Sequence, residues 1–233
     1  MKLRAIIFDL FGTIVDDFAA ASAGSNHAEL PAALGIPYDP FMQQWRQITE
    51  RRSLGEFQTV EASIAYVCRI IGATATVEQM ANAVETRLQL TQRALTPKAD
   101  AVATLETLRN AGFKTGLLSN CSIEIPILWP QTEFAALFHA TVFSSRERVK
   151  KPARQIYNLA CVRLGVAPEE CLYIADGENF ELAAAAEIGM HPVLIKTANT
   201  YSEVRREARE WTGASIATLS EVLQLAALNR NES

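Results

Sequence analysis

The sequence predicts an α/β protein in which a doubly wound parallel sheet carries an inserted helical module. From residue 96 onward, short apolar runs alternate with helical patterns, and such alternation forms parallel sheets with right-handed crossovers. Residues 16–95, in contrast, contain helical patterns without a strand. The chain has 233 residues, of which 49% are hydrophobic, so it can bury one large core or two modest ones.

The first predicted strand is a short apolar run that ends in a carboxylate. Residues 4–8 favour a buried strand, and Asp9, Gly12 and Thr13 follow it directly. Ligands of parallel sheets bind outside the carboxyl ends of the strands, so Asp9 is expected at the rim of the sheet, facing a crevice. From this stretch alone, a role for Asp9 in capping a turn is an equally good interpretation.

The segment after this strand is predicted to form four helices. The first begins near Asp16, and Gly35 and Pro37 end the pattern. The second is expected to have Asp39 as its N-cap and to end at Gly55. The third spans residues 59–71, and a capping box at 76–79 opens the fourth, which runs to about residue 95.

The remainder of the chain is predicted to hold four more strands, a short edge strand and the helices between them. The strands are expected at 114–119, 140–144, 171–175, 192–195 and, at the edge, 214–217. Helices are expected at 102–111, 155–164 and 180–188. The charged run 201–211 is predicted to be the solvated face of a helix.

Bulk composition argues against several classes of partner. The net charge of −4 disfavours nucleic acid and anionic membranes, and no apolar stretch approaches the roughly 18 residues of a membrane span. The amino-terminal apolar run is too short for a signal peptide. The four cysteines form no C-x-x-C pair and are expected to be buried, reduced thiols. We therefore expect a cytoplasmic protein.

Polar side chains follow the predicted strands at one edge of the sheet. Asp9 follows the first strand, Ser119 ends the second, Lys151 follows the third and Asp176 the fourth. Each residue alone could have a structural role, such as capping a turn or lying on the surface. Together, however, they place two carboxylates, a hydroxyl and an ammonium at one edge of the sheet. Two close carboxylates repel each other unless a proton or cation lies between them, and such oxygen-rich pairs suit Mg²⁺. This combination favours phosphoryl chemistry.

The order and spacing of these residues resemble the haloacid dehalogenase superfamily over nearly the whole chain. Residues 9–13 (DLFGT) resemble its first motif, 117–120 (LLSN) its second, Lys151-Pro152 with Tyr157 its third, and 176–181 (DGENFE) its acidic fourth. The helical segment resembles the cap of one branch of that family. The resemblance implies a Rossmann-like core of residues 1–15 and 96–233, with a helical cap at 16–95.

The resemblance also implies roles for individual residues. Asp9 would be the nucleophile that forms an aspartyl-phosphate, Ser119 and Thr13 would bind phosphate oxygens, and Lys151 would neutralise charge. Mg²⁺ would be held by Asp9, the backbone carbonyl of Phe11 and Asp176. Six further residues would lie around metal or substrate: Arg46, Asn120, Tyr157, Gly177, Glu178 and Glu181. Lys150 is interpreted as a solvated neighbour of Lys151.

One position departs from the family's phosphatases. They usually carry an acid/base Asp two residues after the nucleophile, and Phe11, which stands here, cannot move a proton. The family's dehalogenases have an aromatic residue at this position. Trp45-Arg46-Gln47 resembles their substrate-gripping cap segment, but an exposed cap helix with Trp45 in the core is the favoured interpretation of it. These dehalogenases are metal-free, however, and neutral in the fourth motif, where this chain has Asp176.

Three functions remain open from the sequence. A Mg²⁺-dependent phosphohydrolase of a small phosphorylated metabolite is the favoured prediction. The alternatives are a 2-haloacid dehalogenase-type hydrolase and a ligand-binding member with little activity. The expected partner is a small molecule, and the chain is expected to be a monomer or homodimer. Hinges of the cap are expected near Asp16 and Leu95.

Overall fold

The computed structural model describes residues 2–17, 28–196 and 205–228, and its centre is a parallel six-stranded sheet of order β3-β2-β1-β4-β5-β6. The strands are Ala5–Phe8 (β1), Lys114–Ser119 (β2), Ala140–Phe143 (β3), Cys171–Ala175 (β4), His191–Ile195 (β5) and Ser215–Ile216 (β6). The predicted α/β class with a parallel sheet is confirmed. All carboxyl ends of the strands therefore lie along one edge.

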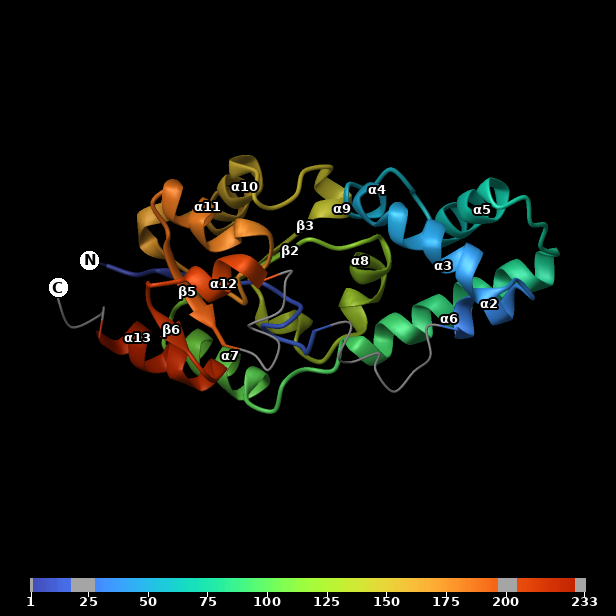
Figure 1. Ribbon diagram of the computed structural model, residues 1–233. Helices are drawn as coiled ribbons and strands as arrows, with labels where there is room; N and C mark the ends of the chain where they lie inside the picture. The colour runs from blue at the N-terminus through green and yellow to red at the C-terminus, as the bar shows by residue number, and fades with distance from the viewer. Residues whose placement is uncertain (1, 18–27, 197–204, 229–233) are drawn as a thin grey trace.

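The two faces of the sheet are buried under different helices (Figure 1). Helices α7 (Ala101–Asn110) and α13 (Val222–Leu228) cover one face, whereas α10 (Arg154–Leu164) and α11 (Glu181–Glu187) cover the other. Alternate residues of β1 divide between the faces, because successive side chains of a strand point in opposite directions: Ile6 and Phe8 join the first cluster, and Ala5 and Ile7 the second.

The described residues between β1 and α7 form five helices, four of which contribute to an apolar cluster separate from the two at the sheet. The five are α2 (Glu29–Ala33), α3 (Tyr38–Gln47), α4 (Thr49–Ser53), α5 (Val60–Ile70) and α6 (Val77–Ala94), and all but α4 contribute to the cluster. Phe41, Trp45 and Ile64 are buried at the centre of this cluster. We call these helices the helical module; in Figure 1 they lie beside the sheet rather than on either of its faces. Its division from the core at residues 15 and 95 stays a prediction.

Three details of the helical module differ from the prediction. The second predicted helix is broken at Ile48 into α3 and α4, and α3 begins at Tyr38 with Pro37 as its N-cap, so Asp39 lies in its first turn. The capping box at Thr76 is present as predicted. The first predicted helix does not begin at Asp16, because residues 16–17 are not helical; residues 18–27 lie outside the described residues, and the first helix described after them is α2.

Short elements join the helical module to the edge of the sheet. Helix α8 (Glu124–Leu128) follows β2, and α9 (Ser144–Glu147) follows β3. Glu124 of α8 is buried against Arg87 of α6. The Oγ of Ser144 donates to the carbonyl of Ser53 at 2.7 Å. Polar contacts therefore join the two parts of the molecule next to the strand ends.

The described segments contain no helix that is both long and apolar enough to cross a membrane. The four cysteines are buried and unpaired, as the sequence predicted.

Candidate active site

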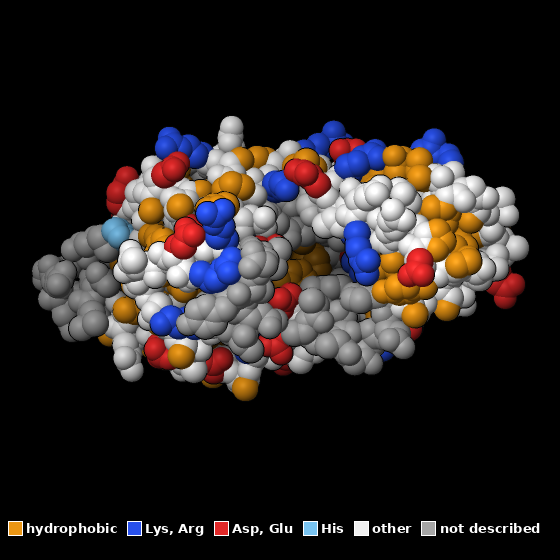
Figure 2. All heavy atoms as spheres, viewed as in Figure 1, with side chains coloured by type: hydrophobic (Ala, Val, Ile, Leu, Met, Phe, Trp, Pro, Cys, Tyr) orange, Lys and Arg blue, Asp and Glu red, His pale blue; other side chains and the backbone are white. Residues whose placement is uncertain are grey.

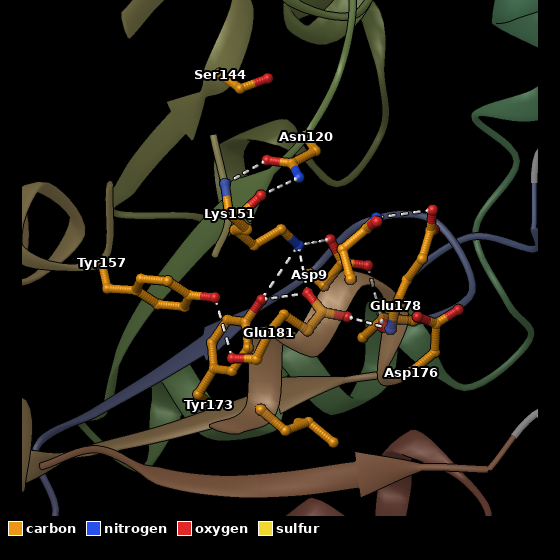
Figure 3. Close-up of polar contacts among 12 residues, drawn as sticks. Asp9, Asn120, Ser144, Lys151, Tyr157, Tyr173, Asp176, Glu178 and Glu181 are labelled. Carbon is orange, nitrogen blue, oxygen red and sulfur yellow. Dashed lines mark hydrogen bonds and ion pairs between the residues drawn. The ribbon is translucent and has the colours of Figure 1, made fainter. Parts of the chain in front are cut away.

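The polar residues predicted from the strand ends meet at one edge of the sheet (Figure 3). Asp9 follows β1, Asp176 follows β4 and Glu181 begins α11. Lys151 precedes α10 and points toward these carboxylates. Because the strands are parallel and adjacent, their ends bring together residues that are distant in the sequence.

Lys151 lies at the centre of this site and is 4% exposed. Its Nζ donates to Asp9, to Glu181 Oε2 at 2.6 Å and to the hydroxyl of Tyr173 at 3.1 Å. Burial alone would lower the pKa of Lys151, but Asp9 and Glu181 raise it above its ordinary value. The ammonium therefore stays charged beside the carboxylate of Asp9.

Two tyrosines hold Glu181 in place. The Tyr173 hydroxyl donates to Glu181 Oε2 at 2.7 Å, and that of Tyr157 donates to the Glu181 backbone carbonyl at 3.0 Å. Tyr157 therefore supports the lysine through Glu181. The sequence analysis missed Tyr173; its signal was a phenol inside an otherwise aliphatic buried strand, because a buried phenol needs a hydrogen-bond partner.

Three buried carboxylates form a candidate metal site. Asp9, Asp176 and Glu181 each offer one oxygen, and these oxygens lie within 4.8 Å of one another. Asp176 is fully buried, and its Oδ1 has no hydrogen-bond partner among the described residues. Burial of a carboxylate oxygen without a hydrogen-bond partner costs roughly several kcal/mol of folding free energy unless a cation binds the oxygen. The carboxylate oxygens thus fit the ligand set that Mg²⁺ prefers.

The protonation of these carboxylates reflects the same crowding. Burial raises the pKa of Asp9 above its ordinary value; Lys151 lowers it and Glu181 raises it again. Burial likewise raises the pKa of Asp176, and Glu181 and Asp9 add to the effect while Arg205 opposes it. Lysine and arginine together therefore do not fully offset the burial and mutual repulsion of these acids.

Arg205 binds Asp176 from the charged run that was predicted to be a solvated helix face. That prediction is wrong at two of the described charged positions. The buried guanidinium of Arg205 contacts Asp176 Oδ2 at 2.6 Å, and buried Glu207 accepts from the backbone N–H of Leu182 at 3.0 Å. Arg205 is the residue before helix α12 (Arg206–Glu210), and Glu207 lies in its first turn. Both side chains are buried, whereas that of Arg206 is exposed. Residues 201–204 lie outside the described segments.

The two residues predicted to bind phosphate, Thr13 and Ser119, are both buried. Thr13 is buried, and its hydroxyl donates to Asp9 Oδ2 at 3.5 Å. Ser119 is also buried, and its Oγ has no hydrogen-bond partner in the segments that the structure describes. Asn120 holds the backbone of Lys151, accepting from its N–H at 2.8 Å and donating to its carbonyl at 3.1 Å.

A cavity of about 470 Å³ opens between this site and the helical module. Figure 2 shows the surface hollowed between the two parts of the molecule. Predicted site residues that line the cavity are Asp9, Phe11, Arg46, Asn120, Lys151, Glu178 and Glu181. Those that do not line it are Thr13, Ser119, Tyr157, Asp176 and Gly177. The carboxylate of Asp9 is thus reached from the cavity, whereas Asp176 is fully buried and does not line it.

The helical module contributes the opposite wall of the cavity. Arg46 and Gln47 of α3 and Glu50 of α4 line it. Lys150, which was interpreted as a solvated neighbour, also lines the cavity and pairs with Glu50 at 3.0 Å. Arg46 is exposed on a helix whose Trp45 is buried in the module's core.

Comparisons with known proteins agree with this architecture. Residues 3–189 match the family model of haloacid dehalogenase-like hydrolases. The chain is 25% identical to (S)-2-haloacid dehalogenase 4A of Burkholderia cepacia, with 83% of each chain covered. It is 29% identical to hexitol phosphatase A of Escherichia coli, with 84% of each covered. Its fold is similar to that of a HAD phosphatase from Thermococcus onnurineus (TM-score 0.65, 20% identity, 96% and 97% covered).

Proposed function

The chain belongs to the haloacid dehalogenase-like hydrolases, and we propose that within this family it is a Mg²⁺-dependent phosphohydrolase of small phosphorylated molecules. The relatives include both dehalogenases and phosphatases, so the choice rests on the site itself. The division into a core and a closing cap, the small-molecule partner and a cytoplasmic location belong to the same proposal.

The observation that carries the proposal is the buried carboxylate of Asp176 beside Asp9. Its Oδ1 has no partner among the described residues and lies in a cluster with Asp9 and Glu181. Without a cation, burial and the charge of Glu181 raise the pKa of Asp9 despite Lys151, and a less ionised carboxylate is a weaker nucleophile. Mg²⁺ would be held by Asp9 and Asp176, and it would supply positive charge for the oxygens of a phosphoryl group.

The proposed reaction begins with Asp9. A carboxylate oxygen of Asp9 attacks phosphorus, the bond to the leaving oxygen breaks, and an aspartyl-phosphate forms on Asp9. Lys151, which already contacts Asp9, lies where negative charge grows in the transition state. Water then hydrolyses the aspartyl-phosphate and releases inorganic phosphate.

Phe11 shapes the substrate preference that we expect. It lines the cavity beside Asp9, but it has no proton to give to a leaving group. General acid–base assistance is worth about 10²- to 10⁴-fold, so substrates whose leaving groups need no proton are favoured. Acyl and aryl phosphates belong to this class.

A second candidate function is hydrolysis of a 2-haloacid, and one observation favours it. Arg46 lines the same cavity as Asp9, so the guanidinium is available to bind a carboxylate substrate while Asp9 attacks carbon. The charge of Asp176 argues against this function, because it disfavours an ionised, metal-free Asp9.

The test is phosphate release from acetyl phosphate, p-nitrophenyl phosphate and phosphoglycolate, measured with Mg²⁺ and with chelator. We expect release that depends on Mg²⁺ and is abolished in Asp9→Asn, which keeps the shape of the side chain and so the fold. Chloride release from 2-chloropropionate in the presence of chelator, with no phosphate release from any substrate, would refute the proposal and favour the second candidate.

A further inference from the structure

Arg205 occupies one oxygen of Asp176 and leaves the other available. Its Nε and Nη2 lie 2.7 Å and 2.6 Å from Oδ2 of Asp176. Nη2 also lies 3.0 Å from an oxygen of Asp17, which helps to fix the guanidinium in position. Arg205 is 3% exposed, so water does not compete for these contacts.

The backbone of Gly12 closes another approach to the same oxygen. A Cβ placed on Gly12 would lie 1.9 Å from Asp176 Oδ2 and 3.3 Å from Arg205 Nη2, and the residue has a φ of +75°. Only glycine fits this position. Oδ2 is therefore enclosed by two donors and a close backbone, whereas Oδ1 has no partner in the described part of the chain.

The number of available oxygens matters for the choice between cations. Mg²⁺ requires nearly octahedral coordination and takes single carboxylate oxygens, whereas Ca²⁺ accepts six to eight oxygens and often binds both oxygens of one carboxylate. An Asp176 with one available oxygen satisfies Mg²⁺ and withholds a ligand from Ca²⁺.

We propose that Arg205 is a positioning residue that restricts Asp176 to one ligating oxygen and so makes the site select Mg²⁺ over Ca²⁺. This inference rests on the proposed function, because it assumes that the site holds a divalent cation. The positive charge of Arg205 opposes any dication to a similar degree. The informative quantity is therefore the ratio of the two affinities rather than either affinity alone.

The experiment is calorimetric titration of the metal-free protein with Mg²⁺ and with Ca²⁺, without substrate. In Arg205→Met, both oxygens of Asp176 become available, and we expect the preference for Mg²⁺ over Ca²⁺ to fall by about tenfold or more. Arg206→Met is the matched control, because Arg206 is the next residue and is exposed, with its partner Glu210 on the surface. Its ratio should equal that of the wild type.

The outcomes separate the inference from the proposed function. A wild-type protein that binds neither cation overturns the proposed function and the inference with it. A wild type that binds Mg²⁺ and a folded Arg205→Met variant with an unchanged ratio overturn the inference alone. If Arg205→Met does not fold, Arg205→Lys replaces two donors to Oδ2 by one; a smaller loss of selectivity supports the inference, and an unchanged ratio overturns it.

Discussion

Replacement of Glu124 by Gln should strongly destabilise the junction between the helical module and the core. Glu124 is 1% exposed, and its Oε1 lies 2.6 Å from Arg87 Nε and 3.9 Å from Arg52 Nη1. The substitution removes the carboxylate that pairs with two buried guanidinium groups. Removal of one partner of a buried ion pair costs about 3–5 kcal/mol.

The pKa of Glu124 gives a second measure of the same effect. Burial would raise this pKa, but Arg87 and Arg52 overcome it and lower the pKa from its ordinary 4.5 to about 2. Each pH unit corresponds to about 1.4 kcal/mol, so the ionised carboxylate contributes about 3 kcal/mol at neutral pH. Because the folded-state pKa is the lower one, this contribution is complete above pH 4.5 and is lost as the pH falls toward 2.

The assay is urea denaturation of the wild type and Glu124→Gln at pH 7 and pH 3.5. We expect the difference in the free energy of unfolding to be about 3 kcal/mol at pH 7 and about 2 kcal/mol at pH 3.5. Glu29→Gln is the control, since Glu29 pairs with Arg93 on the surface and should change stability by less than about 1 kcal/mol. A difference below about 1 kcal/mol in Glu124→Gln at pH 7, or one that does not shrink in acid, would refute the reasoning.

Three further predictions concern the site. In Tyr173→Phe, Lys151 and Glu181 lose the hydroxyl group that both contact, so kcat should fall by about tenfold with little change in KM. An unchanged kcat would show that the Tyr173 hydroxyl does not position Lys151 and Glu181. Acetyl phosphate should be hydrolysed about 10²-fold or more faster than an alkyl phosphate because Phe11 donates no proton, and equal kcat/KM values would contradict this. Mg²⁺ at a hundred times its Kd should stabilise the fold by about 2.7 kcal/mol. This stabilisation should appear as a rise in Tm that chelator reverses and that is absent in Asp176→Asn. A similar rise in Asp176→Asn would show that the metal binds elsewhere.

Local sequence determined the sheet and the position of the site along it. A strand buried on both faces must be a short apolar run, and β1 and β4 are such runs. The residue that follows a strand of a parallel sheet lies at the edge formed by the carboxyl ends of the strands. Asp9 and Asp176 could therefore be predicted at this edge without any knowledge of their neighbours. The capping box at Thr76 was predictable for the same reason, because both of its hydrogen bonds lie within one turn.

Tertiary structure alone decided which charges meet. The sequence interpreted the run that includes Arg205 as solvated because its neighbours are charged, yet in the folded chain Arg205 lies against Asp176, which provides its partner. Tyr173 and Glu124 were missed for the same reason: their partners are distant in the sequence, and a buried polar group is recognised only by what surrounds it. Periodicity encodes which side of an element is buried, whereas the pairing of buried charges depends on how the elements pack.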